Sequence, residues 1–557
     1  MILLEKRRLR PFFSLQKFRS VRCRFCHSGL YWVLVIYEKG EAAMKLRQPL
    51  RETLQEKYRY RLILQGILVG LVAGLVTVAY RFALTYSEKI CRFVFGWAQS
   101  PWQIVVLFAG LLALGVCVGF LTKKEPMIKG SGIPQVEGQL TGYFELPWWK
   151  ILYKKFLGGC LAIFGGLSLG REGPSILLGA NCGQGISQTF HRNRTEEKYL
   201  ITCGACAGLA AAFNAPLAGV LFALEEVHKN FNPKVLLSAM SSAVTADVVS
   251  KLFVGMHSTF SAAPVQVMPI SYYLSLLAFG ALLGLFGAFY NRILLFSQTL
   301  YGKIHWPEPV KMMIPFAFAG LFGLTLPQVL GGGHSMIEAL LHGEYALGLV
   351  AVLLVAKFVF SMISYGSGAP GGIFFPLLVL GALGGALFGR LAILCGVVPE
   401  TYAVNFMLLG MAGMFTAIVR APLTGIILIV EMSGSLTQLL SLSVVCLCAY
   451  IAADLCHSAP IYESLLDRIK PARYQAAHPE ERIFLDLTVQ FGSFVCRKKI
   501  EQVHWPKDCL ITNIVRGRET LIPHGDTVIL PGDMLTILCK SEDEVPLRRK
   551  LSKSLEN

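Results

Sequence analysis

Three short glycine-rich motifs interrupt the apolar part of this sequence, and their residue types are suited to holding an anion. The motifs are Gly130-Ser131-Gly132-Ile133-Pro134, Gly170-Arg171-Glu172-Gly173-Pro174 and Gly371-Gly372-Ile373-Phe374-Phe375-Pro376. Glycine lets the backbone approach a ligand closely, and proline at an early position is typical of a helix start. The unpaired N–H groups of a helix start attract an anion. The motifs therefore predict an anion site built from helix N-termini.

Glu172 adds an ionisable group to the second motif, inside a segment that is otherwise apolar. A charged side chain at the centre of a membrane helix costs about 3 kcal/mol or more on insertion scales, so it is a functional candidate. A carboxylate beside an anion site can occupy that site as a substitute anion, and protonation would release it. For any one motif alone, a kinked and packed helix is the more frequent explanation. Three motifs in one chain favour a site.

Two other patterns would carry chemistry of a different class. Gly166-Leu167-Ser168-Leu169-Gly170 fits the G-x-S-x-G pattern of serine hydrolases, but that pattern needs a strand–turn–helix setting and a partner histidine. Cys23-Arg24-Phe25-Cys26-His27 matches the attachment pattern of haem c, yet the basic segment around it has no export signal. Cys203 and Cys206 lie in an apolar stretch and are interpreted as helix-packing residues. We therefore expect no enzyme, no metal site and no cofactor.

The elements that must position the motifs are membrane helices. Of the 557 residues, 54% are hydrophobic and only 16% are charged, which excludes a soluble enzyme, a secreted disulfide scaffold and a disordered protein. Between about residues 61 and 457 the apolar segments vary in length, and many are broken by Gly or Pro. Broken segments stay in a bilayer only if their ends are buried in protein or face a water-filled cavity. The sequence predicts an all-α polytopic membrane protein with a pathway through it.

An internal repeat divides the apolar region into two halves. Ala215-Pro216-Leu217-Ala218-Gly219 recurs 206 residues later as Ala421-Pro422-Leu423-Thr424-Gly425, and at the same offset Glu225 falls on Glu431. Glu226 has no copy, because Met432 takes its place. Repeats with matching broken helices point to a central site at the repeat interface.

The net charge of +17 is concentrated near the start of the chain, where residues 1–60 hold 14 Lys and Arg against 5 Glu. A basic segment before the first long apolar stretch (Leu62–Leu84) predicts a cytoplasmic N-terminus. This placement makes nucleic acid an unexpected partner. Residues 1–43 are interpreted as a basic extension, and Met44 offers an alternative start that would leave them out of the working protein.

The composition changes after residue 466. Residues 467–483 are interpreted as a linker, whose basic residues predict a cytoplasmic C-terminus. From Arg482 onward apolar residues alternate and turn residues recur, which predicts a small soluble domain over residues 484–550. The expected strands are Leu510–Arg516, Thr527–Leu530 and Met534–Cys539.

GSGIP, GREGP and GGIFFP, in this order and with AAFNAPLAG between them, resemble the CLC family of chloride channels and chloride/proton antiporters. The resemblance covers about residues 60–466, and the three motifs together are highly specific. It implies the CLC fold, an inverted repeat of broken, tilted helices. The implied transport domain is 44–466, with halves of roughly 60–260 and 270–466, and it forms a homodimer with one pathway in each subunit.

The resemblance also implies which residues hold the anion. Ser131 and Tyr462 match the hydroxyls that ligate the central chloride, and the backbone N–H groups of Ile373 and Phe374 complete that site. The motif positions implied to shape the backbone are Gly130, Gly132, Pro134, Gly170, Arg171, Gly173, Pro174, Gly372 and Pro376. Tyr462 has a second interpretation, since an interfacial tyrosine at the end of a last apolar segment is common.

Two carboxylates match the proton path of the family. Glu172 matches the external gating glutamate, which competes with chloride and takes protons, and Glu226 matches the internal proton-transfer glutamate of antiporters. Glu225 and Glu226 would also fit an ordinary helix end near the cytoplasm. Arg171 is interpreted as a structural residue or as a contributor to the electric field at the outer side of the site.

The C-terminal domain resembles the TrkA-C type of bacterial potassium-conductance regulators through LIPHGDT and LPGDML. The resemblance implies a dimeric regulatory module with an unidentified small ligand, and a purely structural role in dimerisation fits equally well. With both termini cytoplasmic, the fold class expected is an all-α multi-pass protein of the cell (inner or plasma) membrane with a small α+β cytoplasmic domain.

Together these observations predict proton-coupled chloride transport across a lipid bilayer, with chloride and protons as the transported partners. The alternative is a passive voltage- or pH-gated chloride channel of the same fold. Glu226 discriminates between them, because an exchanger needs a proton path and a channel does not. Ser131 favours chloride over nitrate or fluoride.

Overall fold

The computed structural model describes residues 30–192, 194–229, 233–256, 260, 265–470, 482–489, 493–506, 509–516, 519–540 and 551. The chain divides into two compact units, Met1–Arg61 and Leu62–Asn557. The first unit is described from residue 30, where helix α1 (Leu30–Trp97) begins. The Cys23–His27 pattern and most of the basic extension lie outside the described residues, as do residues 471–481 of the predicted linker.

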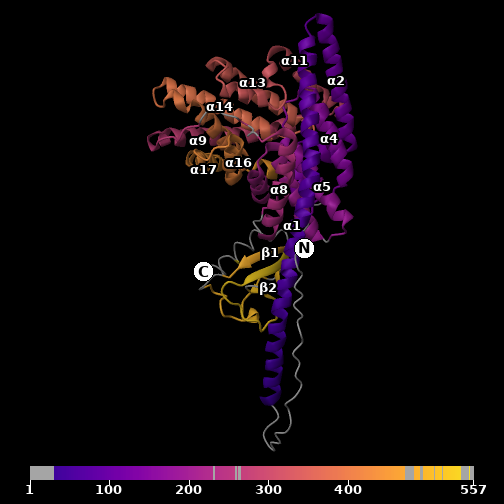
Figure 1. Cartoon of the computed structure of the whole chain (residues 1–557), viewed down its shortest axis with the longest axis vertical. Coiled ribbons are helices and arrows are strands. Elements are labelled where there is room, and N and C mark those ends of the chain that lie inside the picture. Colours follow the sequence, from indigo (N-terminus) through magenta and orange to yellow (C-terminus); the bar gives the residue numbers. More distant parts are fainter. Residues whose placement is uncertain are drawn as a thin grey trace, which may run out of the picture. The chain divides into compact units, whose positions relative to one another are not determined.

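Helices dominate the second unit (Figure 1). After α1 the α-helices are α2 Pro101–Lys124, α3 Ile133–Thr141, α4 Trp148–Phe164, α5 Glu172–Thr189, α6 Arg194–Phe213, α7 Pro216–Phe222, α8 Pro233–Val254, α9 Tyr273–Lys303, α10 Glu308–Lys311, α11 Met313–Thr325, α12 His334–Leu341, α13 Leu347–Gly366, α14 Phe374–Leu394, α15 Ala403–Val419, α16 Pro422–Ser433, α17 Leu439–Leu455 and α18 Ile461–Ile469. A π-helix, η2, spans Ala223–Val227, and the short 3-10 helices are η1 Pro126–Ile128, η3 Ile270–Tyr272, η4 Pro327–Val329, η5 Glu400–Tyr402 and η6 Ile500–Gln502.

Seven helices of the described chain are long and apolar enough to cross a membrane. They lie in α1, α2, α8, α9, α13, α14 and α15. Several others are much shorter, such as α3 and α7, as the broken apolar segments predict. The glycine-rich helix α5 runs without a break from Glu172 to Thr189. Gly179 and Gly183 pack α5 against another helix and do not break it.

The two halves repeat a close helix pair. A Cβ atom on Gly179 of α5 would lie 2.1 Å from the carbonyl oxygen of Gly204 in α6. In the second half, a Cβ atom on Gly381 of α14 would lie 2.4 Å from the carbonyl oxygen of Gly410 in α15. Only glycine permits such an approach, and small residues of this kind let membrane helices pack backbone to backbone. The repeat read from the sequence is therefore also a repeat of packing.

The copied glutamates join the two halves to each other. The Glu225 carboxylate accepts a hydrogen bond from the Thr424 N–H at the start of α16, at 2.9 Å. The Glu431 carboxylate accepts one from the Ala218 N–H at the start of α7, at 2.8 Å. Each carboxylate caps the helix of the opposite half, where helix starts favour negative charge. Glu225 thus has a structural task that Glu226 does not share.

The C-terminal domain contains a four-stranded antiparallel sheet in the order β1-β4-β2-β3, of which Figure 1 labels β1 and β2. The strands are β1 Arg482–Thr488, β2 Cys509–Arg516, β3 Glu519–Leu521 and β4 Met534–Lys540. Ile514, Leu535 and Ile537 are buried in its apolar core. The Asp533 carboxylate, which has no exposed surface, accepts two hydrogen bonds of 2.8 Å from Arg516.

The predicted strands Leu510–Arg516 and Met534–Cys539 correspond to β2 and β4. The prediction of a strand over Thr527–Leu530 is wrong. That segment makes a single isolated bridge, from Val528 to Lys499. Its neighbour Ile529 exchanges hydrogen bonds with an irregular segment near Arg497, so no ladder forms. The apolar residues of this segment could not reveal that its pairing partner is irregular.

Candidate anion-binding site

The structure brings the three glycine motifs together. The Gly371 N–H donates to the Gly130 carbonyl oxygen at 3.0 Å. Gly170 and Gly372 exchange two backbone hydrogen bonds, of 2.7 and 2.8 Å. One motif from the second half is thus held between two motifs of the first. The starts of α3, α5 and α14 follow these loops directly and share one region.

Ser131 lies in the loop before α3, and its side chain is 1% exposed. The residues on either side have left-handed backbones, with φ of +64° at Gly130 and +98° at Gly132, which glycine adopts without strain. Gly173 at the start of α5 packs on this loop, since a Cβ atom there would lie 2.8 Å from the Ser131 Cβ. The Ile133 N–H donates to the Ser131 Oγ at 3.3 Å. Ser131 therefore sits where α3 meets α5.

Pro134 and Pro174 lie in the first turns of α3 and α5, and Pro376 lies in the first turn of α14. A proline there removes no helical hydrogen bond, because the first N–H groups of a helix have no intrahelical acceptor. The remaining N–H groups of each first turn are left for another acceptor. This is the arrangement that the three motifs predict.

Glu172 is the first residue of α5 and is 1% exposed. Its Oε1 lies 3.7 Å from the Nε of the half-buried Arg171, and its Oε2 has no hydrogen-bond partner among the described residues. A Cβ atom on Gly170 would lie 2.5 Å from that Oε2 and 3.0 Å from the Phe375 nitrogen. The carboxylate therefore lies against the start of α14. Burying a carboxylate oxygen without a hydrogen-bond donor costs free energy. Such a cost is expected for a carboxylate that alternates with another anion at the same position.

Ile373 caps α14 and Phe374 is its first residue, with exposures of 1% and 0%. The Phe374 ring packs against Phe213 and Phe222, at centroid distances of 5.3 and 5.7 Å. These rings exclude water from the backbone N–H groups of the α14 start. In a dry setting, such N–H groups interact more strongly with an anion than they would in water.

Tyr462 of α18 also reaches this region. Its ring meets Phe222 edge to face at 6.3 Å, it has no exposed surface, and its hydroxyl has no hydrogen-bond partner among the described residues. The phenol interacts electrostatically with both Glu172 and Glu226. A side chain buried this completely is not an interfacial anchor. Its free donor is available to an anion.

Glu226 lies outside the glycine loops, on the π-helix η2. It is 5% exposed, and its Oε1 has no hydrogen-bond partner among the described residues. The Lys229 ammonium nearby bonds Glu137 at 2.6 Å and Glu463 at 2.5 Å. The structure thus separates Glu225, which caps a helix, from Glu226, which is buried and unused by the fold. An ordinary helix end does not describe Glu226.

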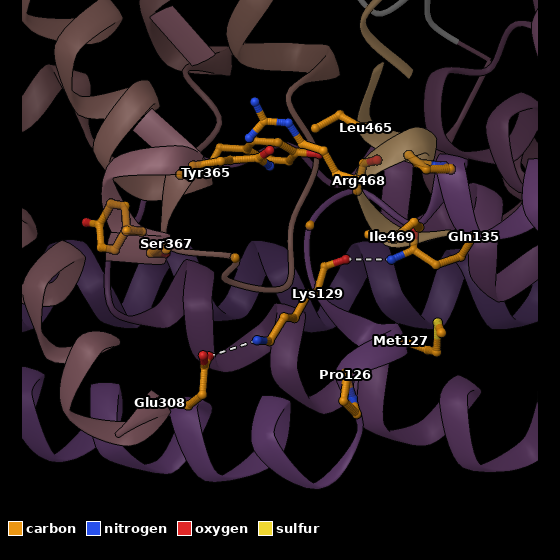
Figure 2. Close-up of a pocket in the computed structure, with 18 of the residues that line it drawn as sticks. Pro126, Met127, Lys129, Gln135, Glu308, Tyr365, Ser367, Leu465, Arg468 and Ile469 are labelled. Carbon is orange, nitrogen blue, oxygen red and sulfur yellow. Dashed lines mark hydrogen bonds and ion pairs between the residues drawn. The ribbon is translucent and has the colours of Figure 1, made fainter. Parts of the chain in front are cut away.

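Two pockets approach the site. One, of about 480 Å³, is lined by Ser131, Tyr365 and Arg468 among others, and Figure 2 shows Lys129 at its wall in an ion pair of 2.8 Å with Glu308. We call it the Ser131 pocket. The other, of about 150 Å³, is lined by residues that include Glu172, Arg171 and His334. We call it the Glu172 pocket. The glycine loops contribute to both pockets, with Gly130 and Ser131 lining the Ser131 pocket and Gly170 and Glu172 lining the Glu172 pocket.

Sequence reasoning missed two buried lysines behind the loops. The Lys155 ammonium, with no exposed surface, donates a hydrogen bond of 2.5 Å to the Gly130 carbonyl oxygen. In the other half, the equally buried Lys357 ammonium donates a hydrogen bond of 2.7 Å to the Gly331 carbonyl oxygen. Each lysine turns loop carbonyls toward itself and adds positive charge behind the loop. The rule that singled out Glu172, an ionisable residue in an apolar helix, would have found both.

The G-x-S-x-G pattern does not form a hydrolase site. The Ser168 hydroxyl is buried and hydrogen-bonded to the Ser361 hydroxyl at 2.9 Å. Ser168 lies in the turn after α4, between two helices, and not between a strand and a helix. The strand–turn–helix setting that the hydrolase pattern needs is therefore missing at this position.

The chain is similar in sequence and in structure to known ion transporters. The H(+)/Cl(-) exchange transporter ClcA of Vibrio parahaemolyticus is 34% identical over 407 residues, which cover 70% of this chain and 86% of the relative. ClcA of Vibrio cholerae is 36% identical over 376 residues, covering 66% and 80%. The crystal structure of a slow cyanobacterial Cl-/H+ antiporter superposes with a TM-score of 0.71 at 28% identity, covering 74% of this chain and 99% of that one.

A CLC-type fluoride/proton antiporter shares the fold, with a TM-score of 0.59 at 24% identity over 72% of this chain and 97% of that one. Residues 484–551 match the TrkA-C domain, and residues 114–454 match the family described as voltage gated chloride channel. The predicted fold class, a helical membrane domain followed by a small C-terminal sheet domain, is confirmed. The chain therefore belongs to the voltage gated chloride channel family.

Proposed function

We propose that this protein exchanges chloride for protons across the cell membrane. The observation that carries the proposal is the buried Glu172 carboxylate at the point where α5 and α14 begin, whose Oε2 has no hydrogen-bond donor among the described residues. A carboxylate in that place is stable only when it substitutes for an anion or carries a proton. The names of the relatives, H(+)/Cl(-) exchange transporters, support the same activity.

Chloride is held by neutral donors in this proposal. The hydroxyls of Ser131 and Tyr462 and the N–H groups of Ile373 and Phe374 are its ligands. Donors without a full positive charge bind an anion and still let it leave, which transport requires. Lys155 and Lys357 supply positive potential from behind the loops, where their ammonium groups are already bonded to carbonyl oxygens.

Protons use two carboxylates. Glu172 takes a proton from the Glu172 pocket, and the neutral side chain leaves the anion position to chloride. Glu226 is the second station, and the Tyr462 phenol interacts electrostatically with both carboxylates. Glu226 lies next to the Glu137–Lys229–Glu463 cluster, whose exposed members give a route for protons from water.

The proposal also includes the oligomeric state of the protein and its orientation in the membrane. The basic residues before Leu62 and those at Arg468 and Lys470 support cytoplasmic termini, because cytoplasmic segments are enriched in Lys and Arg. The Ser131 pocket, which Arg468 lines, then opens to the cytoplasm. The protein works as a homodimer in the lipid bilayer with one pathway in each subunit, no cofactor in the pathway, and a TrkA-C domain that binds a small cytoplasmic ligand.

The experiment that tests exchange is a reversal-potential measurement on purified protein in liposomes. With a chloride gradient and no proton gradient, we expect uphill proton movement and a reversal potential displaced from the chloride equilibrium potential. A proton gradient should likewise drive chloride. Chloride flux with a reversal potential at the chloride value at every proton gradient would identify a passive channel and overturn the proposal.

A further inference from the structure

The loop before α12 has the same backbone as the loop before α3 that carries Ser131. Gly331 and Gly333 have φ of +64° and +99°, and the corresponding values at Gly130 and Gly132 are +64° and +98°. Each loop leads directly into a helix of similar length. We call residues 130–132 the first loop and residues 331–333 the second loop. The internal repeat therefore extends to these two loops.

A buried lysine fixes each loop in the same way. Lys155 donates to two carbonyl oxygens at the first loop. Lys357 donates to the carbonyl oxygens of Val329 and Gly331 at the second, at 2.9 and 2.7 Å. A Cβ atom on Gly333 would lie 3.4 Å from the Lys357 Nζ, so the loop packs closely on the ammonium. The side chain that follows the second loop is thus held on a rigid backbone.

The two copies differ in their polar side chains. Gly332 stands where the first loop has Ser131, so the second loop lacks that hydroxyl. His334 stands where α3 has Ile133, and it is the first residue of α12. The second copy therefore presents an imidazole where the first presents a hydroxyl and an apolar residue.

The His334 ring joins an exposed carboxylate to a buried pocket. Its Nε2 lies 3.5 Å from the Oε1 of Glu338, a side chain that is 56% exposed. Its Nδ1 is buried and has no hydrogen-bond partner among the described residues. The ring packs against Phe375 at a centroid distance of 5.6 Å, and the Phe375 nitrogen is the one beside the Glu172 carboxylate.

The surroundings of His334 favour a neutral ring with its proton on Nε2. Burial and the positive charges of Arg171 and Arg81 disfavour a second proton on the ring. A neutral imidazole has one donor nitrogen and one acceptor nitrogen, and the Glu338 carboxylate can only accept, so Nε2 carries the proton and Nδ1 is the acceptor. The other charged side chains around the ring are Glu88 and Arg92 of α1, Glu172 of α5 and Lys357 of α13.

The Glu172 pocket is lined by two residues that each carry an unpartnered buried atom. These atoms are the Glu172 Oε2 and the His334 Nδ1, which have no hydrogen-bond partner among the described residues. When Glu172 takes up a proton, its carboxyl group becomes a hydrogen-bond donor. The pocket volume of about 150 Å³ leaves room for that group, since a water molecule takes up about 30 Å³.

We propose that the protonated Glu172 carboxyl donates a hydrogen bond to the His334 Nδ1 in the Glu172 pocket, and that His334 thereby holds this side chain away from the anion position while chloride occupies it. His334 is a positioning residue, because it acts through Glu172. The ionised carboxylate has no proton to donate to Nδ1, so His334 stabilises only the protonated state. This inference rests on the proposed function, since it takes Glu172 as the group that alternates with chloride.

The pH dependence of chloride flux tests the proposal on the full-length protein in liposomes. His334→Phe keeps a ring beside Phe375 but offers no acceptor. The protonated, displaced Glu172 then loses one neutral hydrogen bond, about three- to tenfold in its population, so the pH of half-maximal flux should fall by about 0.5 to 1 unit. The flux reached at acid pH and the ratio of protons to chloride should not change, because Glu172 still carries the proton. Misfolding would lower the flux at every pH.

Three further variants separate the hydrogen bond from a structural effect. His334→Asn can place an amide oxygen near the position of Nδ1, and it should restore most of the shift. His342→Phe is the matched control, because His342 is an exposed histidine at the other end of α12, and its profile should match that of the unaltered protein. In Glu172→Gln, the addition of His334→Phe should shift nothing, since the titrating group is absent.

Each remaining outcome overturns a stated part of the account. An unchanged pH of half-maximal flux in His334→Phe refutes the role of His334, and so does an equal fall in His334→Asn. A lower ratio of protons to chloride in His334→Phe would mean that the ring transfers protons, which contradicts a purely positioning role. Chloride flux through Glu172→Gln that still follows pH refutes the proposed function itself, whereas a pH-independent Glu172→Gln with an unshifted His334→Phe refutes only this inference.

Discussion

Replacing Glu172 with glutamine is expected to abolish proton transport while chloride still crosses the membrane. Glutamine has nearly the shape of the protonated carboxyl group, but it cannot bind or release a proton, so the coupling step is lost. Its uncharged amide also no longer competes with chloride for the helix starts. The measurement is chloride efflux and proton uptake from liposomes, with a proton-to-chloride ratio near zero for Glu172→Gln.

The pH dependence of chloride flux tests the same role of Glu172. In the unaltered protein a fall in pH protonates Glu172, removes the substitute anion and raises chloride flux. The flux through Glu172→Gln should depend little on pH, because the group that titrates is gone. Glu88→Gln is the matched control, since Glu88 lines the same Glu172 pocket and should keep coupling. Proton transport that persists in Glu172→Gln contradicts the role of Glu172.

Replacing Glu226 with glutamine is also expected to uncouple the protein. The buried Glu226 is the second proton station of the proposal, and an amide there interrupts proton transfer while the anion site around Ser131 keeps its geometry. We expect proton uptake to fall by at least about tenfold, in the range that removal of a proton-transfer group costs, with chloride flux retained.

Glu225→Gln is the matched control for Glu226, because the two glutamates are neighbours on η2. Glu225 caps α16, so its replacement should lower stability by about 1 kcal/mol but leave the ratio of protons to chloride intact. A double variant, Glu172→Gln with Glu226→Gln, that remains fully coupled would refute both assignments.

Much of the site could be predicted from the sequence, because its residues are unusual for a membrane segment. Glycine–proline motifs mark helix starts, and Glu172 is a charge in an apolar stretch, so local rules were sufficient. The repeat located the central region, and the lack of a copy for Glu226 separated it from Glu225. The same local rule applied to Lys155 and Lys357 would have found the positive charges behind the loops.

Other features depend on contacts that no local pattern encodes. By sequence Tyr365 is an ordinary tyrosine in an apolar helix, and only the approach of α13 to the Gly130 loop reveals that its hydroxyl lies beside that loop. Likewise, no local pattern predicts that Glu225 and Glu431 each cap a helix of the opposite half. In the C-terminal domain, the segment Thr527–Leu530 has the β-branched and apolar residues of a strand but pairs with an irregular stretch, so its secondary structure is set by its partner.

The most direct test of the account is the position of a halide in crystals of the protein and of Glu172→Gln grown with bromide, located by anomalous scattering. The account predicts a bromide within hydrogen-bonding distance of the Ser131 and Tyr462 hydroxyls in both crystals. It predicts a second bromide in Glu172→Gln alone, at the place that the Glu172 carboxylate occupies beside the Phe375 nitrogen. Bromide found away from Ser131, Tyr462 and the α14 start, or the same single position in both crystals, would contradict it.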